Sequence, residues 1–337
     1  MWLGLLACGA SACERTKVAT SEPASVNATG AATTSGAAPK APNLAAATSA
    51  AASATPAESA RSAASDVSPR ESAASPQPPI SLEMRLVSDL KPGERRPLVV
   101  FLHGLGASAK VSFEVMPLEA MGKRDRVHVI AADGTLDSSG RRFWNAGKAC
   151  CNFDDQPIDD VARLGALLDT WSKRPDVDPS RIYLAGYSNG GFMAHRLACE
   201  RGDKLAAVVV LAGGVEIAGA CPAQPKLSLL IMHGDADPIV SYAGGHVFQK
   251  PGLAPYLPVV EGFREWGKRL GCKRERAGTS LDLDPKLPGA ETASLGFERC
   301  EFGDVELLSV HGGTHYIGSR QGVVEAAWKF LLSHRKR

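Results

Sequence analysis

Six short apolar runs, alternating with helical patterns, constrain the fold of this 337-residue chain. The runs are rich in β-branched residues, which is typical of strands buried on both faces. They are 96–102, 127–132, 181–185, 205–212, 227–232 and 305–310. Apolar residues at helical spacing occupy 157–171, 191–199, 259–270 and 323–332. This alternation predicts an α/β fold with a mostly parallel, doubly wound sheet, helices on both faces, and functional residues after the strands.

The first part of the chain has a different composition. No aromatic residue lies between Trp2 and Phe101, and residues 14–79 are mostly Ala, Ser, Thr and Pro. Such a segment buries too little apolar surface to offset its ordering entropy, so we expect a disordered linker over 14–79 and one folded domain over 80–337. The net charge of +2 includes no basic cluster, so no nucleic-acid partner is predicted. No apolar run reaches the length of a membrane span.

The amino terminus resembles a bacterial lipoprotein signal. Leu5-Leu6-Ala7-Cys8 fits the lipobox, with Cys8 as the lipidated residue and Cys13 as a weaker second candidate. The apolar run is short and no Lys or Arg precedes it. We expect a signal and anchor region over 1–13, and a secreted or cell-surface lipoprotein, extracellular or periplasmic, that meets the membrane only through its lipid.

Six further cysteines lie in the expected domain. None has a C-x-x-C spacing or a His at zinc-finger distance, so no metal site is predicted. In an exported domain they favour disulfides, whereas in a cytoplasmic enzyme they would be buried free thiols. Cys272 and Cys300 bracket a polar, Pro-containing insertion and are a plausible pair. The other four are Cys150, Cys151, Cys199 and Cys221.

Ser188 is the candidate nucleophile. It lies in Gly186-Tyr-Ser188-Asn-Gly190, between the run 181–185 and a helical pattern. A G-x-S-x-G turn from strand to helix exposes the serine hydroxyl, and its glycines allow the sharp bend. The following helix directs its positive amino end toward the site. The alternative is a tight turn that carries an inert serine.

A serine hydroxyl needs a histidine base oriented by a carboxylate. In α/β-hydrolases the order along the chain is serine, acid, histidine. His311 and His315 both follow the last apolar run, and His315, in a Gly-Gly-Thr-His loop, is favoured as the base. Asp235 and Asp237 follow the run 227–232; Asp237 is favoured as the acid, and Asp235 could cap the turn instead.

Two backbone N–H groups are expected to form the oxyanion hole, which stabilises the charge that develops during ester cleavage. One belongs to Asn189, next to Ser188, and the other to Leu105, in the loop after the run 96–102. His103 is expected to hold this loop by hydrogen bonds, and His233 to be a structural residue beneath the site. This chemistry requires no metal or organic cofactor.

Several segments together resemble one family, the secreted esterases grouped as polyhydroxybutyrate depolymerase-like and feruloyl esterase-like (LpqC-type). The segments are 97–104, 144–151, 159–161, 186–200, 233–237 and 312–315. The resemblance covers essentially all of 80–337. It implies an α/β-hydrolase catalytic domain with Ser188 as nucleophile, Asp237 as acid and His315 as base. It also implies hydrolysis of esters of hydroxy acids, or of phenolic or acetyl groups on plant polysaccharide.

The chain departs from the family after the histidine, where many members have Trp-Pro and this chain has Tyr316-Ile317. We expect Tyr187 and Tyr316 to contact the substrate. Trp144 is expected either to line the acyl or sugar pocket or to pack in the core. No polymer-binding module is visible, so small or oligomeric esters are the expected partners. The alternatives are a serine peptidase or acyltransferase with the same triad, a lipase, for which no lid segment is evident, and a catalytically inactive surface-binding protein.

Overall fold

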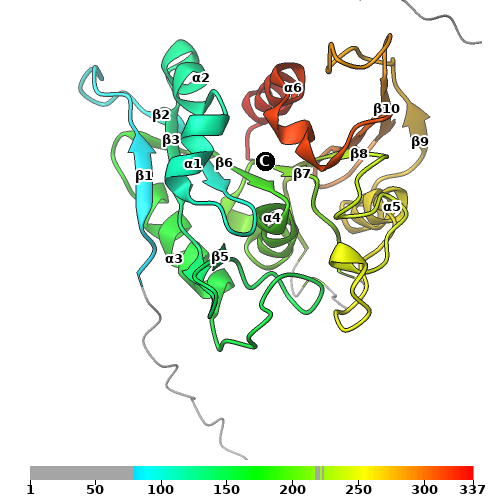
Figure 1. Ribbon diagram of the computed structural model, residues 1–337. Helices are drawn as coiled ribbons and strands as arrows, with labels where there is room; N and C mark the ends of the chain where they lie inside the picture. The colour runs from blue at the N-terminus through cyan, green and yellow to red at the C-terminus, as the bar shows by residue number, and fades with distance from the viewer. Residues whose placement is uncertain (1–78, 217–220, 222–223, 337) are drawn as a thin grey trace, which may run out of the picture. The chain divides into compact units, whose positions relative to one another are not determined.

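The computed structural model describes residues 79–216, 221 and 224–336, which belong to one compact unit, Arg70–Arg337 (Figure 1). The expected signal region, Cys8 and the expected linker up to residue 78 lie outside the described residues. Within the described ranges, no helix has the length and apolar character needed to cross a bilayer.

A nine-stranded sheet forms the centre of the described domain. Its six middle strands are parallel, and the strands at its two edges are antiparallel to their neighbours. In spatial order the strands are β1 (Leu82–Arg85), β3 (His128–Ala132), β2 (Arg96–Leu102), β6 (Val177–Tyr187), β7 (Ala207–Leu211), β8 (Ser228–Gly234), β11 (Val305–Val310), β10 (Thr292–Phe297) and β9 (Glu275–Ala277). The predicted mostly parallel sheet is therefore confirmed.

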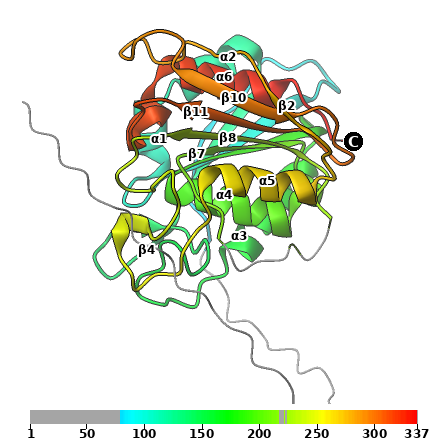
Figure 2. The same cartoon turned by 90° about the vertical axis from the view of Figure 1, so that its right-hand side faces the viewer.

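Helices cover both faces of the sheet, as predicted (Figure 2). One face carries α3 (Asp160–Ser172), α4 (Asn189–Glu200) and α5 (Val259–Arg269). The other carries α1 (Ala109–Val115), α2 (Leu118–Asp125) and α6 (Gln321–Leu332). The strands contribute alternate side chains to the two cores, which is why their sequences are apolar throughout. The shorter elements are a hairpin of β4 (Thr135–Leu136) and β5 (Arg142–Phe143), and the 3-10 turns η1 (Gly202–Lys204), η2 (Val247–Gln249) and η3 (His315–Ser319).

The edge strands and two helices escaped the sequence prediction. The segment between Cys272 and Cys300, expected to be a polar insertion, contains β9 and β10, which extend the sheet beyond β11. Every residue of β9 is exposed, so this strand lacks the apolar run by which the central strands were found. The strand β1 and the helices α1 and α2 were missed because they are short and carry few buried residues.

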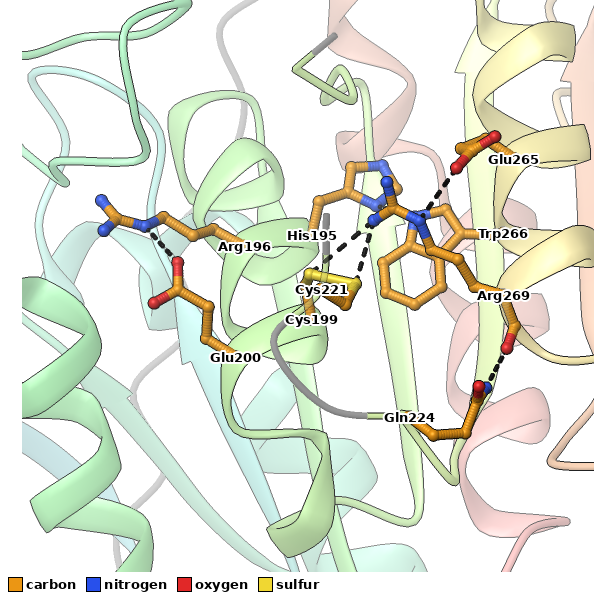
Figure 3. The surroundings of a disulfide bond; sticks show 9 residues. All are labelled: His195, Arg196, Cys199, Glu200, Cys221, Gln224, Glu265, Trp266 and Arg269. Atoms are coloured by element: carbon orange, nitrogen blue, oxygen red, sulfur yellow. Dashed lines mark hydrogen bonds and ion pairs between the residues drawn. A yellow bond between two sulfur atoms is a disulfide. The ribbon is translucent and has the colours of Figure 1, made fainter. Parts of the chain in front are cut away.

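Three disulfides join the six cysteines of the domain. Cys272 pairs with Cys300, as predicted, and the adjacent residues Cys150 and Cys151 pair with each other. Cys199, at the end of α4, pairs with Cys221, and the guanidinium of Arg269 contacts both sulfurs (Figure 3). The alternative of free buried thiols is therefore wrong.

Candidate active site

Ser188 lies on the sharp turn between β6 and α4. Its φ of 55° is positive, a region that a residue with a Cβ rarely adopts, so the turn is strained. Two flanking glycines make the turn sterically feasible. A Cβ on Gly186 would lie 2.1 Å from the carbonyl oxygen of Gly190, and one on Gly190 would lie 2.2 Å from that of Leu102. The predicted strand–turn–helix setting of Ser188 is thus present.

Ser188, His315 and Asp237 form one hydrogen-bonded chain. His315 Nε2 lies 2.9 Å from Ser188 Oγ, and His315 Nδ1 lies 2.7 Å from Asp237 Oδ2. Because a carboxylate accepts the Nδ1 proton, neutral His315 presents an unprotonated Nε2 to the serine hydroxyl. Both His315 and Asp237 are buried. Three residues from separate parts of the sequence therefore meet in the arrangement that can draw a proton from a serine hydroxyl.

The carboxylate of Asp237 is held by four donors. Its Oδ1 accepts the backbone N–H groups of Ile239 at 2.8 Å and Val240 at 2.9 Å. Its Oδ2 faces His315 Nδ1, and His233 Nε2 lies 3.3 Å away. Burial raises the pKa of Asp237, but the hydrogen bonds from the two histidines, the charge interaction with His315 and the Val240 N–H together outweigh it and place that pKa well below its usual range. Asp237 is therefore charged at neutral pH.

The alternative residues Asp235 and His311 form a separate pair. His311 Nδ1 lies 2.8 Å from Asp235 Oδ2, and both side chains are partly or largely exposed. Asp235 Oδ1 accepts the backbone N–H of Gly312 at 2.7 Å, so this aspartate ties two loops together. The structure thus brings His315 and Asp237, and not the alternative pair, to Ser188.

The loop that carries Leu105 packs directly against Ser188. A Cβ added to Gly104 would lie 3.2 Å from Ser188 Cβ. His103 holds this loop, as expected: its Nδ1 donates to the carbonyl oxygen of Gly104 at 2.7 Å, and its Nε2 accepts the N–H of Gly134 at 3.0 Å. Burial lowers the pKa of His103, which keeps the ring neutral. Because C=O and N–H point in opposite directions across a trans peptide, fixing the Gly104 carbonyl also fixes the direction of the Leu105 N–H.

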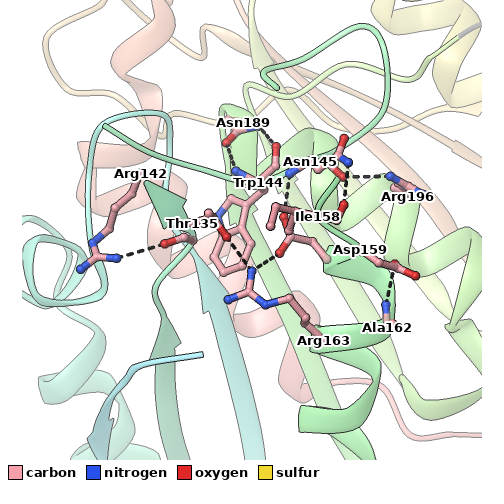
Figure 4. Close-up of polar contacts among 12 residues, drawn as sticks. Thr135, Arg142, Trp144, Asn145, Ile158, Asp159, Ala162, Arg163, Asn189 and Arg196 are labelled. Atoms are coloured by element: carbon pink, nitrogen blue, oxygen red, sulfur yellow. Dashed lines mark hydrogen bonds and ion pairs between the residues drawn. The ribbon is translucent and has the colours of Figure 1, made fainter. Parts of the chain in front are cut away.

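Asn189, the first residue of α4, is held through its side chain by the backbone of Trp144 (Figure 4). Its Oδ1 accepts the Trp144 N–H at 2.7 Å, and its Nδ2 donates to the Trp144 carbonyl at 3.0 Å. The indole of Trp144 is fully buried and donates to the carbonyl oxygen of His103 at 3.1 Å. Trp144 is therefore a packed core aromatic, the second of the two expectations, and not a residue that lines a pocket. It braces both segments that carry the expected oxyanion donors, the loop of Leu105 and the start of α4.

Comparison with known proteins agrees with this geometry. Residues 90–253 match the family model described as phospholipase/carboxylesterase. The chain is 28% identical over 243 residues to feruloyl esterase B of Piromyces equi, covering 70% of this chain and 41% of that protein. It is 30% identical over 239 residues to the putative esterase NocK of Nocardia uniformis subsp. tsuyamanensis, covering 66% of this chain and 65% of that protein. The chain is thus similar to these esterases and has an α/β-hydrolase fold. It spans less than two thirds of the length of either relative.

Solved structures support the α/β-hydrolase fold of the chain. An acetyl xylan esterase from Aspergillus awamori superposes with a TM-score of 0.51 at 13% identity, over 75% of this chain and 94% of that one. A Bacillus cereus carboxylesterase superposes with a TM-score of 0.50 at 17% identity, over 75% and 94% of the two chains. At these identities the likeness establishes the α/β-hydrolase fold alone.

The two tyrosines expected to contact substrate differ in their surroundings. The Tyr187 hydroxyl donates to the backbone carbonyl oxygen of His315 at 2.8 Å, so it positions the loop of the histidine. Burial raises the pKa of Tyr187 above its usual range, which keeps the phenol protonated. Tyr316 is 63% exposed, and its ring centroid lies 6.0 Å from that of His315. Of these two tyrosines, Tyr316 is the one that presents an exposed aromatic surface beside the site.

A polar cluster behind the Trp144 loop was not assigned a role from the sequence. Asp160, fully buried at the start of α3, accepts the backbone N–H of Asn145 at 2.7 Å and pairs with Arg163. Arg196, on α4, donates to the carbonyl oxygen of Asn145 at 2.9 Å. The signal in the sequence that could have pointed to this cluster was the segment 159–161, which is part of the family resemblance. Across the described residues, no group of three or more His, Cys, Asp or Glu could hold a metal ion.

Proposed function

We propose that this chain hydrolyses carboxylic esters through an acyl-enzyme formed on Ser188. The observation that carries the proposal is the hydrogen-bonded chain from Ser188 Oγ through His315 to a charged Asp237, with Ser188 on a strained turn. Similarity to proteins named as esterases supports the same reaction class.

In this reaction His315 Nε2 takes the proton from Ser188 Oγ as that oxygen attacks the ester carbonyl. The N–H groups of Leu105 and Asn189 stabilise the negative oxygen of the tetrahedral intermediate. His315 then gives its proton to the departing alkoxide. Water, deprotonated by His315, attacks the acyl-enzyme and restores Ser188. Asp237 remains ionised throughout and keeps the histidine proton on Nδ1.

We propose soluble small or oligomeric esters as substrates, with feruloyl and acetyl esters of plant polysaccharide and hydroxyalkanoate oligomers as the classes to compare. Similarity to feruloyl esterases supports the first class. The exposed ring of Tyr316 beside His315 supports an aromatic or sugar ring near the site, because such rings stack on aromatic side chains.

We also propose that the protein acts outside the cytoplasm, tethered through Cys8. Three disulfides in one domain support an oxidising compartment. Metabolic labelling of the full-length protein with a palmitate analogue tests the tether, with Cys8→Ala as the control. Equal labelling of Cys8→Ala and the natural sequence would contradict it.

The decisive experiment compares the wild-type protein with Ser188→Ala. We expect Ser188→Ala to fold normally and to lose nearly all turnover of p-nitrophenyl acetate and all labelling by a fluorophosphonate probe. Wild-type turnover in this variant would overturn the assignment. Absence of labelling in the wild type would favour a catalytically inactive binding protein. A panel of methyl ferulate, acetylated xylan, hydroxybutyrate oligomers and a peptide amide then separates the ester classes from a peptidase.

A further inference from the structure

A second histidine contacts the carboxylate of Asp237 from below the site. His233 is near the end of β8, and its Nε2 lies 3.3 Å from Asp237 Oδ2. Both side chains are fully buried. The same oxygen of Asp237 accepts His315 Nδ1 at 2.7 Å, so the two imidazoles converge on one carboxylate atom.

The surroundings of His233 settle which nitrogen carries its proton. Its Nε2 lies 2.7 Å from the carbonyl oxygen of Val240, and a carbonyl can only accept, so Nε2 carries hydrogen. Its Nδ1 is buried and has no hydrogen-bond partner among the described residues, as suits an unprotonated nitrogen. The Nε2–H of His233 is therefore shared between Val240 and Asp237.

These contacts close a ring of hydrogen bonds around the acid. Val240 accepts from His233 through its carbonyl and donates to Asp237 Oδ1 through its N–H. His233 therefore restrains Asp237 twice, once directly at Oδ2 and once through the turn that supplies donors to Oδ1. A carboxylate held at both oxygens cannot rotate away from His315.

We infer that His233 is a positioning residue, which holds Asp237 charged and aimed at His315 through its Nε2–H. This inference rests on the proposed function, in which His315 is the base. A carboxylate with one donor fewer on Oδ2 would be freer to rotate, which weakens its alignment with the His315 Nδ1–H. It would also be more basic, which favours a proton on the Asp237–His315 pair.

Four other titratable groups near this cluster are neutral near pH 7, and the exposed pair of Asp235 and His311 is unchanged in the variants below. His195, on α4, is hydrogen-bonded to Trp266 Nε1 (Figure 3), and burial lowers its pKa to about 3. Burial raises the pKa of three nearby phenols, which keeps them protonated; they are Tyr187, Tyr242 and Tyr256. A change in the pH dependence of the variants below therefore reports on the cluster of Asp237 and its two histidines.

A matched pair of variants tests the inference in the full-length protein. His233→Gln retains a donor at the position of Nε2, and His233→Leu removes it. With p-nitrophenyl acetate we expect His233→Leu to lower kcat by about 10- to 100-fold, the effect of losing a hydrogen bond to a charged group, with KM little changed. We expect the acid limb of its kcat/KM profile to move to higher pH, because Asp237 loses a donor that lowers its pKa. His233→Gln should recover most of the wild-type kcat and most of the wild-type pH profile.

His128→Leu is the control for loss of a buried histidine. His128 is fully buried at the amino end of β3, whereas the site follows the carboxyl ends of the strands. Its ring accepts the N–H of Val87 and contacts the carbonyl oxygen of Asp176. The His128→Leu variant should leave the pH profile of kcat/KM unchanged. A folded His233→Leu with wild-type kcat and pH profile overturns the inference, as does His233→Gln behaving like His233→Leu.

A measurement on the wild type keeps the inference testable even if His233→Leu does not fold. Nitrogen-15 NMR of the imidazoles should show His233 with its proton on Nε2, and a protonated Nδ1 would overturn the inference. Failure of the proposed function can be told apart from failure of this inference. If the proposed function is wrong, the wild type itself lacks turnover and Ser188→Ala behaves like the wild type.

Discussion

The hydroxyl of Tyr187 donates a 2.8 Å hydrogen bond to the backbone carbonyl oxygen of His315. Tyr187, the residue immediately before Ser188, thus holds His315, which contacts Ser188 although it lies far along the sequence. The rings of Tyr187 and His315 also pack together, with centroids 5.4 Å apart. The turn that shapes the serine and the loop that carries the histidine are therefore fastened to each other as well as to the sheet.

Tyr187→Phe removes this hydrogen bond and keeps the ring contact. We expect kcat/KM for p-nitrophenyl acetate to fall by about 3- to 10-fold, the usual effect of one neutral hydrogen bond. The thermal midpoint should change little, since the ring still fills its space. Steady-state kinetics at several pH values provide the measurement. A variant as active as the wild type would show that the sheet and the Asp237 contact suffice to place His315.

His103→Ala releases the Gly104 carbonyl and so the direction of the Leu105 N–H. We expect kcat to fall by about 10- to 100-fold with KM little changed, because the oxyanion forms only after substrate is bound. His103→Asn, which keeps a donor near the position of Nδ1, should be less impaired. Steady-state kinetics on the two variants measure the difference. Equal kcat values for His103→Ala and the wild type would contradict the role assigned to this loop.

The Cys272–Cys300 disulfide is expected to stabilise the domain without affecting catalysis. It links residues 28 positions apart, for which the chain-entropy model gives about 3 to 4 kcal/mol of stabilisation. Cys272→Ser with Cys300→Ser should lower the free energy of unfolding by about this amount, measured by urea titration. Turnover at 25 °C should be unchanged, because the pair encloses the edge strands β9 and β10. A change in KM would show that this edge contributes to substrate binding.

The stability of the protein should fall as the pH drops from about 6.5 toward 3, in part because of His195. Burial lowers its pKa to about 3, whereas in the unfolded chain it is protonated below about 6.5, so the unfolded state binds the proton first. One such group contributes at most about 1.4 kcal/mol per pH unit.

His195→Asn removes the titrating group and keeps an acceptor for Trp266 Nε1. Its unfolding free energy should therefore decline less between pH 7 and pH 4.5 than that of the wild type, although its value at pH 7 is lower because a cavity is left. Urea titrations at the two pH values measure the difference. Identical slopes for the two proteins would show that His195 is protonated in the folded state as well.

The central sheet and the meeting of Ser188, Asp237 and His315 could be predicted from the sequence. The runs 96–102 and 305–310 coincide with β2 and β11, because strands buried on both faces leave an uninterrupted apolar signal. Chain order and position after a strand then restricted the histidine and the acid to two candidates each. The choice within each pair rested on loop character, and the contacts of His315 and Asp237 agree with it.

The sequence placed His233 beneath the site as a structural residue, but it did not predict the contacts by which residues support the site from behind. Trp144, Asp160 and His233 act through backbone atoms that only the fold brings together, and no spacing rule reports such contacts. Tyr187 was expected to contact the substrate, whereas in the structure its hydroxyl donates to the backbone carbonyl oxygen of His315. The antiparallel edge strands were missed because exposure removes the apolar pattern.

The strands β8 and β11 are parallel neighbours, with Gly234 paired to Val310 at their ends. The chain leaves β8 after Gly234 and reaches β11 at Val305, having formed α5 and the edge strands β9 and β10 of the same sheet on the way. The acid and the histidine therefore follow strands that are hydrogen-bonded to each other, whatever lies between them along the chain. In evolution the segment between Asp237 and Val305 can lengthen, shorten or acquire new substrate contacts while the distance between Asp237 and His315 stays constant.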